Sequence, residues 1–169
     1  MLPPPRSDGN YRIAVVCLGN ICRSPVADVV LNARIEDAGL AGRVTVDSSG
    51  TGDWHLGDPM DRRAAATLTA EGYDPTAHRS RQFTAASADD YDLVLAMDRD
   101  NFADLRSLGV DPERLRLFRD FDPMPGDGQV PDPFYGGESG FTDVLAMVQR
   151  AAIELTEQLR TTIGAGSSR

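Results

Sequence analysis

The chain has 169 residues and a mass of 18.2 kDa, which suits a single domain with a substantial core. Its composition, with 41% hydrophobic and 25% charged residues, excludes a disordered or fibrous protein and is typical of a globular one. The net charge of −9 argues against nucleic acid or a membrane as the main partner, so any site for an anion must be built locally. All 17 basic residues are arginine, which excludes lysine chemistry such as a Schiff base.

The ends of the chain and its two cysteines bear on domain limits and location. Two cysteines five positions apart do not form a disulfide scaffold, which favours a cytoplasmic protein with reduced thiols. No apolar run approaches the length of a membrane span, and residues 1–10 lack the apolar core of a signal peptide. We expect flexible tails at residues 1–10 and 164–169, on either side of one domain at residues 11–163.

Strand patterns alternate with helix patterns along the chain. A short β-rich apolar run predicts a strand at residues 11–17, and further strand-like segments follow at 43–48, 92–97 and 115–118. The first helix is expected to begin with Ser24 as N-cap and Pro25 as its first helical residue. Three helices end at a glycine that precedes an apolar residue, and these pairs are Gly39-Leu40, Gly72-Tyr73 and Gly109-Val110. The last helix has one apolar face, formed by Phe141, Val144, Leu145, Val148, Ala152, Leu155 and Leu159.

This alternation predicts an α/β fold. We expect a single domain with a central four-stranded, parallel, twisted sheet and helices on both of its faces. Ligands of such folds bind at the carboxyl ends of the strands, and residues 17–23 lie at such an end. The irregular stretch at residues 119–140 is too long for a simple connection, and its aromatic residues favour a functional loop.

The corner after the first strand carries the chemistry. A loop that leads into a helix N-terminus directs several backbone N–H groups into one concavity, where an anion is favoured. Gly19 and Asn20 tolerate the backbone angles that such a loop requires. Cys17 faces this field as a thiolate, and the planar fork of Arg23 can hold two oxygens of a phosphate. The sequence therefore predicts a phosphate-binding loop with a nucleophile aimed at phosphorus.

The sequence resembles the low-molecular-weight protein tyrosine phosphatases. Four segments match motifs of that family in family order over roughly residues 11–160: "CLGNICRSP", "TVDSSGTGDWHLG", "HRSRQF" and "DPFYG". The resemblance implies hydrolysis of phosphotyrosine in proteins with release of inorganic phosphate, and it implies neither a cofactor nor a metal. It implies that residues 11–163 form a phosphatase domain.

The resemblance also implies a role for each matched residue. Cys17 is the nucleophile that forms a phosphocysteine, Arg23 binds the phosphate, and Ser24 stabilises the thiolate. Asp132 is the general acid and base. Further loop residues bind phosphate or substrate: Leu18, Gly19, Asn20, Ile21 and Cys22. Trp54, Phe134 and Tyr135 wall the cleft, with His55 as a further candidate, while Ser48 and His78 support the loop by holding Asn20.

The chain departs from the family pattern at three positions. Leu18 stands where a small residue such as threonine is common, and Phe134 stands where tyrosine is common. Gly140 replaces an aspartate near the start of the last helix. These changes bear on substrate preference more than on catalysis.

Several residues have a second interpretation. Cys22 is either a small core residue or a redox partner that captures oxidised Cys17 as a disulfide. Asp132 precedes a proline and also suits a plain turn, while Asp120, Asp122 and Asp127 are other acids of the same loop. Trp54 also suits core packing. Asp98 is expected to be a helix N-cap, and roles for Arg79 and Arg81 stay open.

Three other functions fit parts of the pattern. A phosphoarginine phosphatase shares the loop, although bulky Ile21 and the two aromatic residues of "DPFYG" favour a phenyl ring. A thioredoxin-coupled arsenate reductase needs further cysteines to pass a disulfide outward, and only Cys17 and Cys22 exist. A non-catalytic module that binds a phospho-ligand predicts binding without turnover.

Overall fold

Four parallel strands form the centre of the molecule in the computed structural model, which describes residues 1–167. They are β1 (Tyr11–Cys17), β2 (Val44–Gly50), β3 (Leu93–Ala96) and β4 (Leu115–Leu117), in the order β2-β1-β3-β4. The register pairs Cys17 with Gly50 and Val16 with Ala96, so the carboxyl ends of β1, β2 and β3 lie side by side. The predicted parallel sheet is confirmed.

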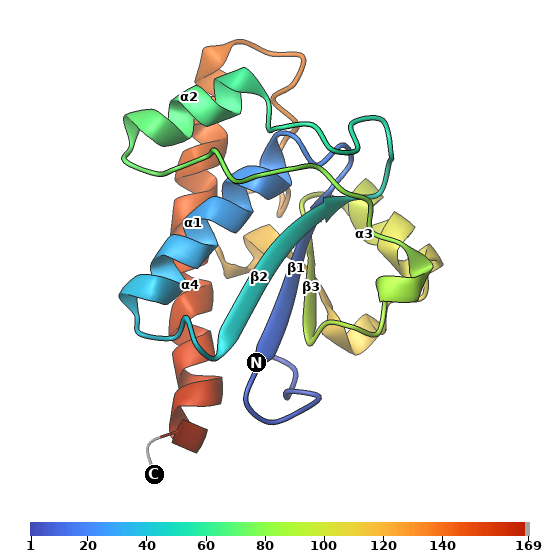
Figure 1. Cartoon of the computed structure of the whole chain (residues 1–169), viewed down its shortest axis with the longest axis vertical. Helices are drawn as coiled ribbons and strands as arrows, with labels where there is room; N and C mark the ends of the chain where they lie inside the picture. Colours follow the sequence, from blue (N-terminus) through green and yellow to red (C-terminus); the bar gives the residue numbers. More distant parts are fainter. Residues whose placement is uncertain (168–169) are drawn as a thin grey trace.

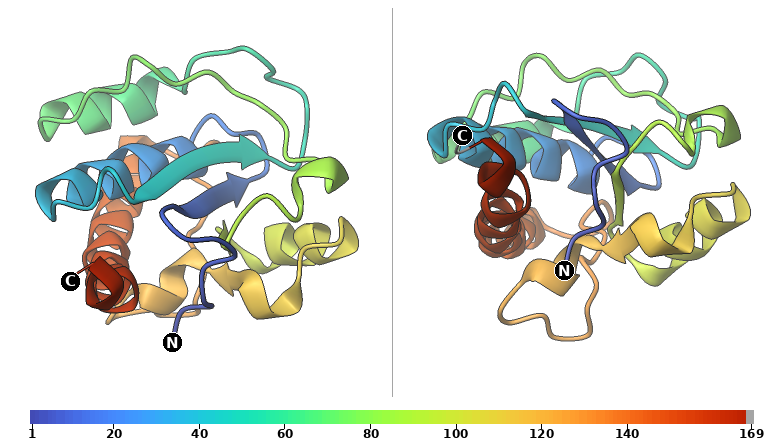
Figure 2. Two further views of the ribbon diagram at one scale, coloured as in Figure 1. Left: turned by 60° about the horizontal axis from the view of Figure 1, so that its bottom comes forward. Right: turned by 90° about the horizontal axis from the view of Figure 1, so that it is seen from below.

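Helices cover both faces of the sheet (Figures 1 and 2). One face packs against α1 (Arg23–Asp37) and α4 (Glu138–Ser167), with α2 (Arg62–Ala70) packed on α4. The other face packs against α3 (Arg99–Ser107). Alternate residues of β1 serve the two sides: Val15 and Cys17 belong to the larger core, and Val16 to the smaller one.

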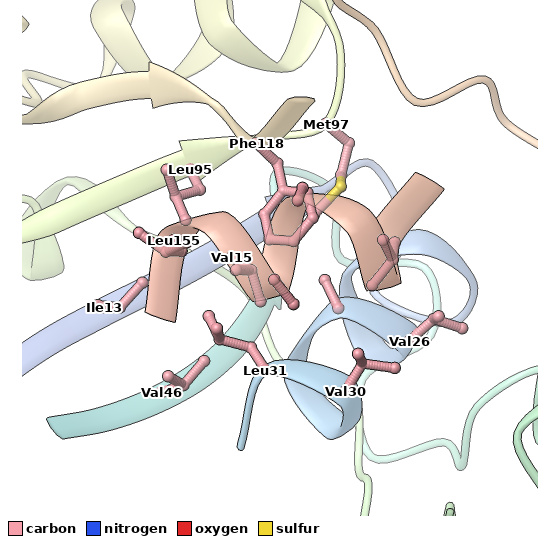
Figure 3. Packing of buried hydrophobic residues seen from close by; sticks show 14 of the residues in the cluster. Ile13, Val15, Val26, Val30, Leu31, Val46, Leu95, Met97, Phe118 and Leu155 are labelled. Atoms are coloured by element: carbon pink, nitrogen blue, oxygen red, sulfur yellow. The ribbon is translucent and has the colours of Figure 1, made fainter. Parts of the chain in front are cut away.

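The larger core lies between the sheet and helices α1 and α4 (Figure 3). Side chains of β1 and β2 meet Val30 and Leu31 of α1 and Leu155 of α4 there. The seven residues that predict the apolar face of α4 are all buried: Phe141, Val144, Leu145, Val148, Ala152, Leu155 and Leu159. This core fixes the position of α1, and α1 begins directly after the loop at residues 18–22.

Three helices end at the glycines that the sequence predicts, but the N-cap of α1 differs from the predicted residue. Gly39, Gly72 and Gly109 have φ values of 76°, 86° and 99°, which favour glycine. The N–H of Leu40 bonds the Ile35 carbonyl over 3.0 Å, as a Schellman ending requires. Ser24 is not the N-cap as expected, because α1 begins at Arg23 and the Ser24 hydroxyl points back toward Cys17.

The predicted N-terminal tail contacts the domain, and the predicted C-terminal tail is helical up to Ser167. In the segment 1–10, Leu2 is buried and the Pro3 carbonyl accepts a hydrogen bond of 2.9 Å from the Tyr11 hydroxyl. Helix α4 continues to Ser167, past the expected start of the second tail at residue 164. Residues 168 and 169 lie outside the described part of the chain. Within residues 1–167, no helix combines the length and the hydropathy that a membrane span requires.

Candidate active site

Cys17 is the last residue of β1, and the loop that follows it curls around its sulfur. Cys17 Sγ accepts a hydrogen bond from the Asn20 N–H over 3.3 Å and lies 3.0 Å from the Ser24 hydroxyl, with which it also bonds. The residue is buried, but it lines a pocket that opens to the surface. The arrangement surrounds the sulfur with donors, as a stabilised thiolate requires.

Asn20 fixes the shape of this loop. Its φ of 57° makes it the one non-glycine residue in the left-handed region within residues 1–167. Its side-chain amide donates to the Ser24 hydroxyl over 2.9 Å, and Oδ1 accepts from the Arg81 N–H over 2.9 Å. Its carbonyl lies 2.7 Å from His78 Nε2 and 2.7 Å from the Ser80 hydroxyl. Four partners therefore offset the strain of a left-handed backbone.

The two residues expected to hold Asn20 lie in different places. His78 contacts Asn20 as expected, through the Asn20 carbonyl. Burial lowers the pKa of His78, and the bond to Asn20 raises it only in part. Because a carbonyl oxygen can only accept, His78 Nε2 is the donor in this bond. Ser48 does not hold Asn20. It is opposite Val15 in the sheet and faces α1, where its hydroxyl bonds the Asp28 carboxyl.

Arg23 extends from the first turn of α1 into the floor of the pocket. Its Nη1 donates to Asp98 Oδ2 over 2.6 Å and to the Val130 carbonyl over 3.0 Å. Its Nη2 lies 3.7 Å from Asp132 Oδ2. Burial lowers the pKa of the guanidinium, but Cys17, Asp98 and Asp132 together raise it above its ordinary value. The fork is therefore charged and held in one orientation.

Asp98 makes two contacts near the pocket, and the sequence predicts only one of them, the N-cap of α3. The expected N-cap is confirmed, because Asp98 Oδ1 accepts from the Asn101 N–H over 2.7 Å. The second oxygen anchors Arg23. The position of Asp98 in the sequence could have indicated the second contact. Strand β3 is the neighbour of β1, so a carboxylate at the carboxyl end of β3 lies close to the loop after β1.

One pocket of about 340 Å³ gathers most of the predicted site residues. Its lining consists of Cys17, Leu18, Gly19, Ile21, Cys22, Arg23, Trp54, His55, Asp132, Phe134 and Tyr135. Trp54 is 68% exposed, which rules out core packing for its indole. Phe134 packs edge-on against Tyr135, with ring centroids 5.0 Å apart. The Cys17 thiol and the charged Arg23 thus lie in the same pocket as aromatic and apolar side chains.

Asp132 is the aspartate of the 119–140 stretch that lines the pocket. Its Oδ1 accepts from the Phe134 N–H over 3.0 Å, so the turn interpretation also holds, while Oδ2 faces Arg23. The other three aspartates of this stretch have different partners. Asp122 is paired with Arg119 and Arg150, Asp120 accepts from the Leu117 N–H, and Asp127 accepts from the Gln129 N–H.

Helix α2 connects the two sides of the pocket through residues that the sequence analysis missed. The Asp61 N–H donates to the Ile21 carbonyl of the loop over 2.8 Å. The Asp61 side chain caps α2 and pairs with Arg63. Arg63 in turn donates to the Phe134 carbonyl over 2.9 Å and to the Gly136 carbonyl over 3.2 Å. No local pattern marks these residues, because their partners lie far away in the sequence.

Cys22 is buried beside the phosphate loop, and both cysteines are free thiols. Burial raises the pKa of the Cys22 thiol, and the negative charges of Asp61 and Cys17 raise it further. It belongs to the larger core, as the first of its two interpretations expects. Its role as a redox partner of Cys17 stays a prediction. Among residues 1–167, no group of three or more His, Cys, Asp or Glu side chains is arranged to hold a metal ion.

Comparisons with known proteins agree with this geometry. The model of the family described as low molecular weight phosphotyrosine protein phosphatase matches residues 12–164. A low molecular weight protein-tyrosine-phosphatase of Streptomyces coelicolor is 45% identical over 155 residues, which cover 89% of this chain and 94% of that protein. Low molecular weight protein-tyrosine phosphatase A of Mycobacterium tuberculosis is 43% identical over 141 residues, or 82% of this chain and 85% of that protein. A crystal structure of a protein tyrosine phosphatase from Entamoeba histolytica has a TM-score of 0.85 and 32% identity, covering 90% of this chain and 98% of that one. The chain belongs to the low molecular weight phosphotyrosine protein phosphatase family.

Proposed function

We propose that this chain is a protein-tyrosine phosphatase that works through a phosphocysteine on Cys17. One observation carries the proposal: a single pocket holds the Cys17 thiol, the Arg23 fork and the Asp132 carboxyl. The proposed domain spans residues 11–163. The substrates are phosphotyrosine-containing proteins, and the cytoplasmic location expected from the cysteine content belongs to the same proposal.

In the first step, the loop N–H groups of residues 18–23 and the Arg23 guanidinium bind the phosphate oxygens. The Cys17 thiolate attacks phosphorus in line with the phenolic oxygen, so an S–P bond forms as the P–O bond breaks. Asp132 donates its proton to the departing phenolate, which leaves as neutral tyrosine. Arg23 is already fixed by Asp98, so little reorganisation is needed as charge spreads over the phosphoryl oxygens.

In the second step, a water molecule attacks the phosphocysteine from the side that the phenol has left. Asp132, now a carboxylate, takes a proton from this water, and the S–P bond breaks. Cys17 leaves as a thiolate that the Ser24 hydroxyl stabilises from 3.0 Å. Inorganic phosphate is released and the site returns to its first state.

The walls of the pocket favour an aryl phosphate over a short alkyl phosphate. The Trp54, Phe134 and Tyr135 side chains line the pocket, so a flat phenyl ring between them buries apolar surface on both sides. Phosphoserine is too short to reach these walls and the Cys17 sulfur together. Ile21 also lines the pocket, which supports the phenyl ring over the longer, polar chain of phosphoarginine.

The test separates catalysis from binding. Cys17→Ser should abolish turnover of phosphotyrosine while inorganic phosphate still binds; a Cys17→Ser chain that retains full turnover overturns the mechanism. Asp132→Asn should lower kcat by roughly 10²–10⁴ for phosphotyrosine, the range of general acid catalysis. The loss should be much smaller for an aryl phosphate whose phenol leaves without a proton. The alkaline limb of the pH–rate profile should disappear in Asp132→Asn, and an unchanged profile would assign the acid to another residue.

Two further assays discriminate the alternatives. Phosphoarginine and phosphotyrosine peptides are compared on the same preparation, and a faster rate with phosphoarginine contradicts the proposed substrate class. Arsenate-dependent consumption of thioredoxin-derived electrons would instead support a reductase. Phosphate binding without turnover of either peptide would indicate a binding module.

A further inference from the structure

A second hollow lies beside the candidate active site, on the far side of Trp54. It has a volume of about 370 Å³ and is lined by Leu18, Thr51, Gly52, Trp54, Asp104, Ser107 and Leu108. We name it the Trp54–α3 groove. Leu18 and Trp54 also line the active-site pocket, so the groove adjoins that pocket at these two side chains. A peptide whose phosphotyrosine enters the pocket therefore passes beside the groove.

The groove has apolar walls and one charged group. Leu18 is 42% exposed and Trp54 is 68% exposed, and both side chains lie at the mouth of the pocket. Leu108 adds apolar surface from the end of α3. Asp104 is exposed and supplies the one charge among the lining residues, which include no arginine. This combination suits a side chain with an alkyl stem and a positive end.

We infer that the Trp54–α3 groove binds a lysine or arginine next to the phosphotyrosine of a substrate protein. The inference rests on the proposed function and names the substrate class more closely. The alkyl stem of the basic side chain packs on Leu18 and Leu108, and its cation meets the Asp104 carboxylate. The face of the Trp54 ring attracts the same cation.

Charge around the pocket supports this preference. Asp53 is exposed next to Trp54, and Asp58 is exposed beside His55. The chain carries a net charge of −9, and Arg23, the one arginine that lines the pocket, is buried at its floor. Substrates with acidic neighbours of phosphotyrosine therefore meet repulsion at the mouth, whereas basic neighbours meet attraction.

The experiment measures kcat/KM for a set of phosphotyrosine peptides with alanine at every other position. Lysine, norleucine or glutamate replaces alanine at one position at a time, within three residues of the phosphotyrosine. We expect lysine to exceed glutamate by roughly two- to fivefold at one or two positions, the strength of an exposed ion pair. Norleucine should fall between them, because it keeps the stem without the charge. The preference should weaken as salt is added.

Variants of α3 tie the preference to the groove. Asp104→Asn should remove most of the difference between lysine and glutamate, and Asp104→Lys should reverse it. Asp100→Lys is the matched control, since it makes the same charge change on the same helix at a residue outside the groove lining. Free phosphotyrosine, which has no neighbours, should be turned over equally by all three variants and the parent chain.

Two outcomes overturn the inference. One is a set of peptides with no preference for lysine at any position. The other is a preference that Asp104→Lys and Asp100→Lys change equally, which would assign it to the general field of the protein. Failure of the proposed function has a different signature, because the parent chain would then not hydrolyse free phosphotyrosine either.

Discussion

Asp98 holds Arg23 with one carboxylate oxygen and the N-terminus of α3 with the other. The bond from Arg23 Nη1 to Oδ2 is 2.6 Å long, and the bond from the Asn101 N–H to Oδ1 is 2.7 Å long. A single side chain thus joins the Arg23 guanidinium to the end of β3 and to the helix on the opposite face of the sheet.

Asp98→Asn is expected to weaken phosphate binding and catalysis while it preserves α3. Asparagine is as good an N-cap as aspartate, but it carries no charge to anchor the guanidinium. A hydrogen bond to a charged group is worth about 1.5–3 kcal/mol, so kcat/KM should fall by roughly 10- to 100-fold. Steady-state kinetics with phosphotyrosine, together with binding of inorganic phosphate, measures the effect.

The control for Asp98→Asn is Asp111→Asn. Asp111 caps a short 3₁₀ turn through its bond with the Glu113 N–H and does not line the pocket. It should change neither kinetics nor phosphate affinity. Equal activity losses in both variants would show that the effect comes from general destabilisation and not from Arg23.

Gly52→Ala is expected to displace the Trp54 indole. A Cβ at position 52 would lie 1.9 Å from Cζ3 of that ring, so the ring must move. The aryl group of a substrate then loses one wall of the pocket, and KM should rise by roughly two- to tenfold at nearly constant kcat, the range of aromatic pair energies. Trp54 is the one tryptophan in the chain, so its fluorescence reports the movement directly.

Gly42→Ala is the matched control, because no atom lies within 4 Å of a Cβ at that position. Its fluorescence and KM should equal those of the parent chain. An unchanged KM in Gly52→Ala, with an altered fluorescence spectrum, would show that the indole does not contact substrate.

The sequence predicts the sheet and the phosphate loop well because the signals for both are local. Each strand lies in a short strand-like segment, and the loop is one continuous segment between β1 and α1. The connections of the site depend on distant segments and could not be predicted. Asp98 reaches Arg23 across 75 positions, and Arg63 reaches Phe134 across 71. Such pairs depend on how the helices pack, which no short pattern records.

Ser48 shows a different limit of the sequence. Its position in β2 is as predicted, yet its side chain faces α1 and Asp28, and not Asn20. Side chains alternate between the two faces of a sheet, so a shift of one residue along the strand places a side chain on the opposite face, among different neighbours. Asn20 is held instead by the Arg81 backbone, which belongs to a loop without helix or strand.

Arg63→Ala is expected to slow the general acid step more than phosphate binding. Arg63 bonds the carbonyls of Phe134 and Gly136, which follow Asp132 in the same loop, and its guanidinium lies 5.5 Å from the Phe134 ring centroid. Without these contacts the carboxyl loses its fixed position, and kcat should fall by about tenfold. The loss should shrink for aryl phosphates with good leaving groups, since they need no proton.

Arg62→Ala serves as the control for this variant. Arg62 is the exposed neighbour of Arg63 on α2 and contributes nothing to the pocket lining. Its kcat should match that of the parent chain with every leaving group. A loss in Arg63→Ala that is the same for good and poor leaving groups would contradict the role of Arg63 in positioning the acid.

Asp28 is expected to make folding stability fall as pH rises through the acid range. Burial raises the pKa of Asp28 from 3.8 to about 6, and the hydrogen bonds from Ser48 and Asn32 offset only part of that effect. The folded chain therefore binds this proton more tightly than the unfolded chain, so Asp28 costs stability between pH 4 and 6 and its full penalty is present above about pH 6. Relative to the parent, Asp28→Asn should gain on the order of 1–3 kcal/mol between pH 4 and pH 7.

Urea unfolding of both chains at several pH values measures this difference. Asp37→Asn, at the exposed end of the same helix, is the control and should show no such gain. A constant difference between Asp28→Asn and the parent from pH 4 to pH 7 would show that Asp28 does not titrate in this range.

The two parts of the site, the loop after β1 and the segment that contains Asp132, are expected to differ in resistance to local unfolding, because β1 lies at the centre of the sheet. The inner residues of β1, from Ile13 to Val16, are fully buried between two neighbouring strands, so their amides exchange hydrogen only when the whole domain opens. Residues 122–137, which include Asp132, contain neither helix nor strand, so we expect them to open at lower cost. Warming or mild denaturant is therefore expected to remove proton donation by Asp132 before it removes phosphate binding at Cys17 and Arg23. Under those conditions we expect a state that still binds phosphate but turns over only substrates with good leaving groups.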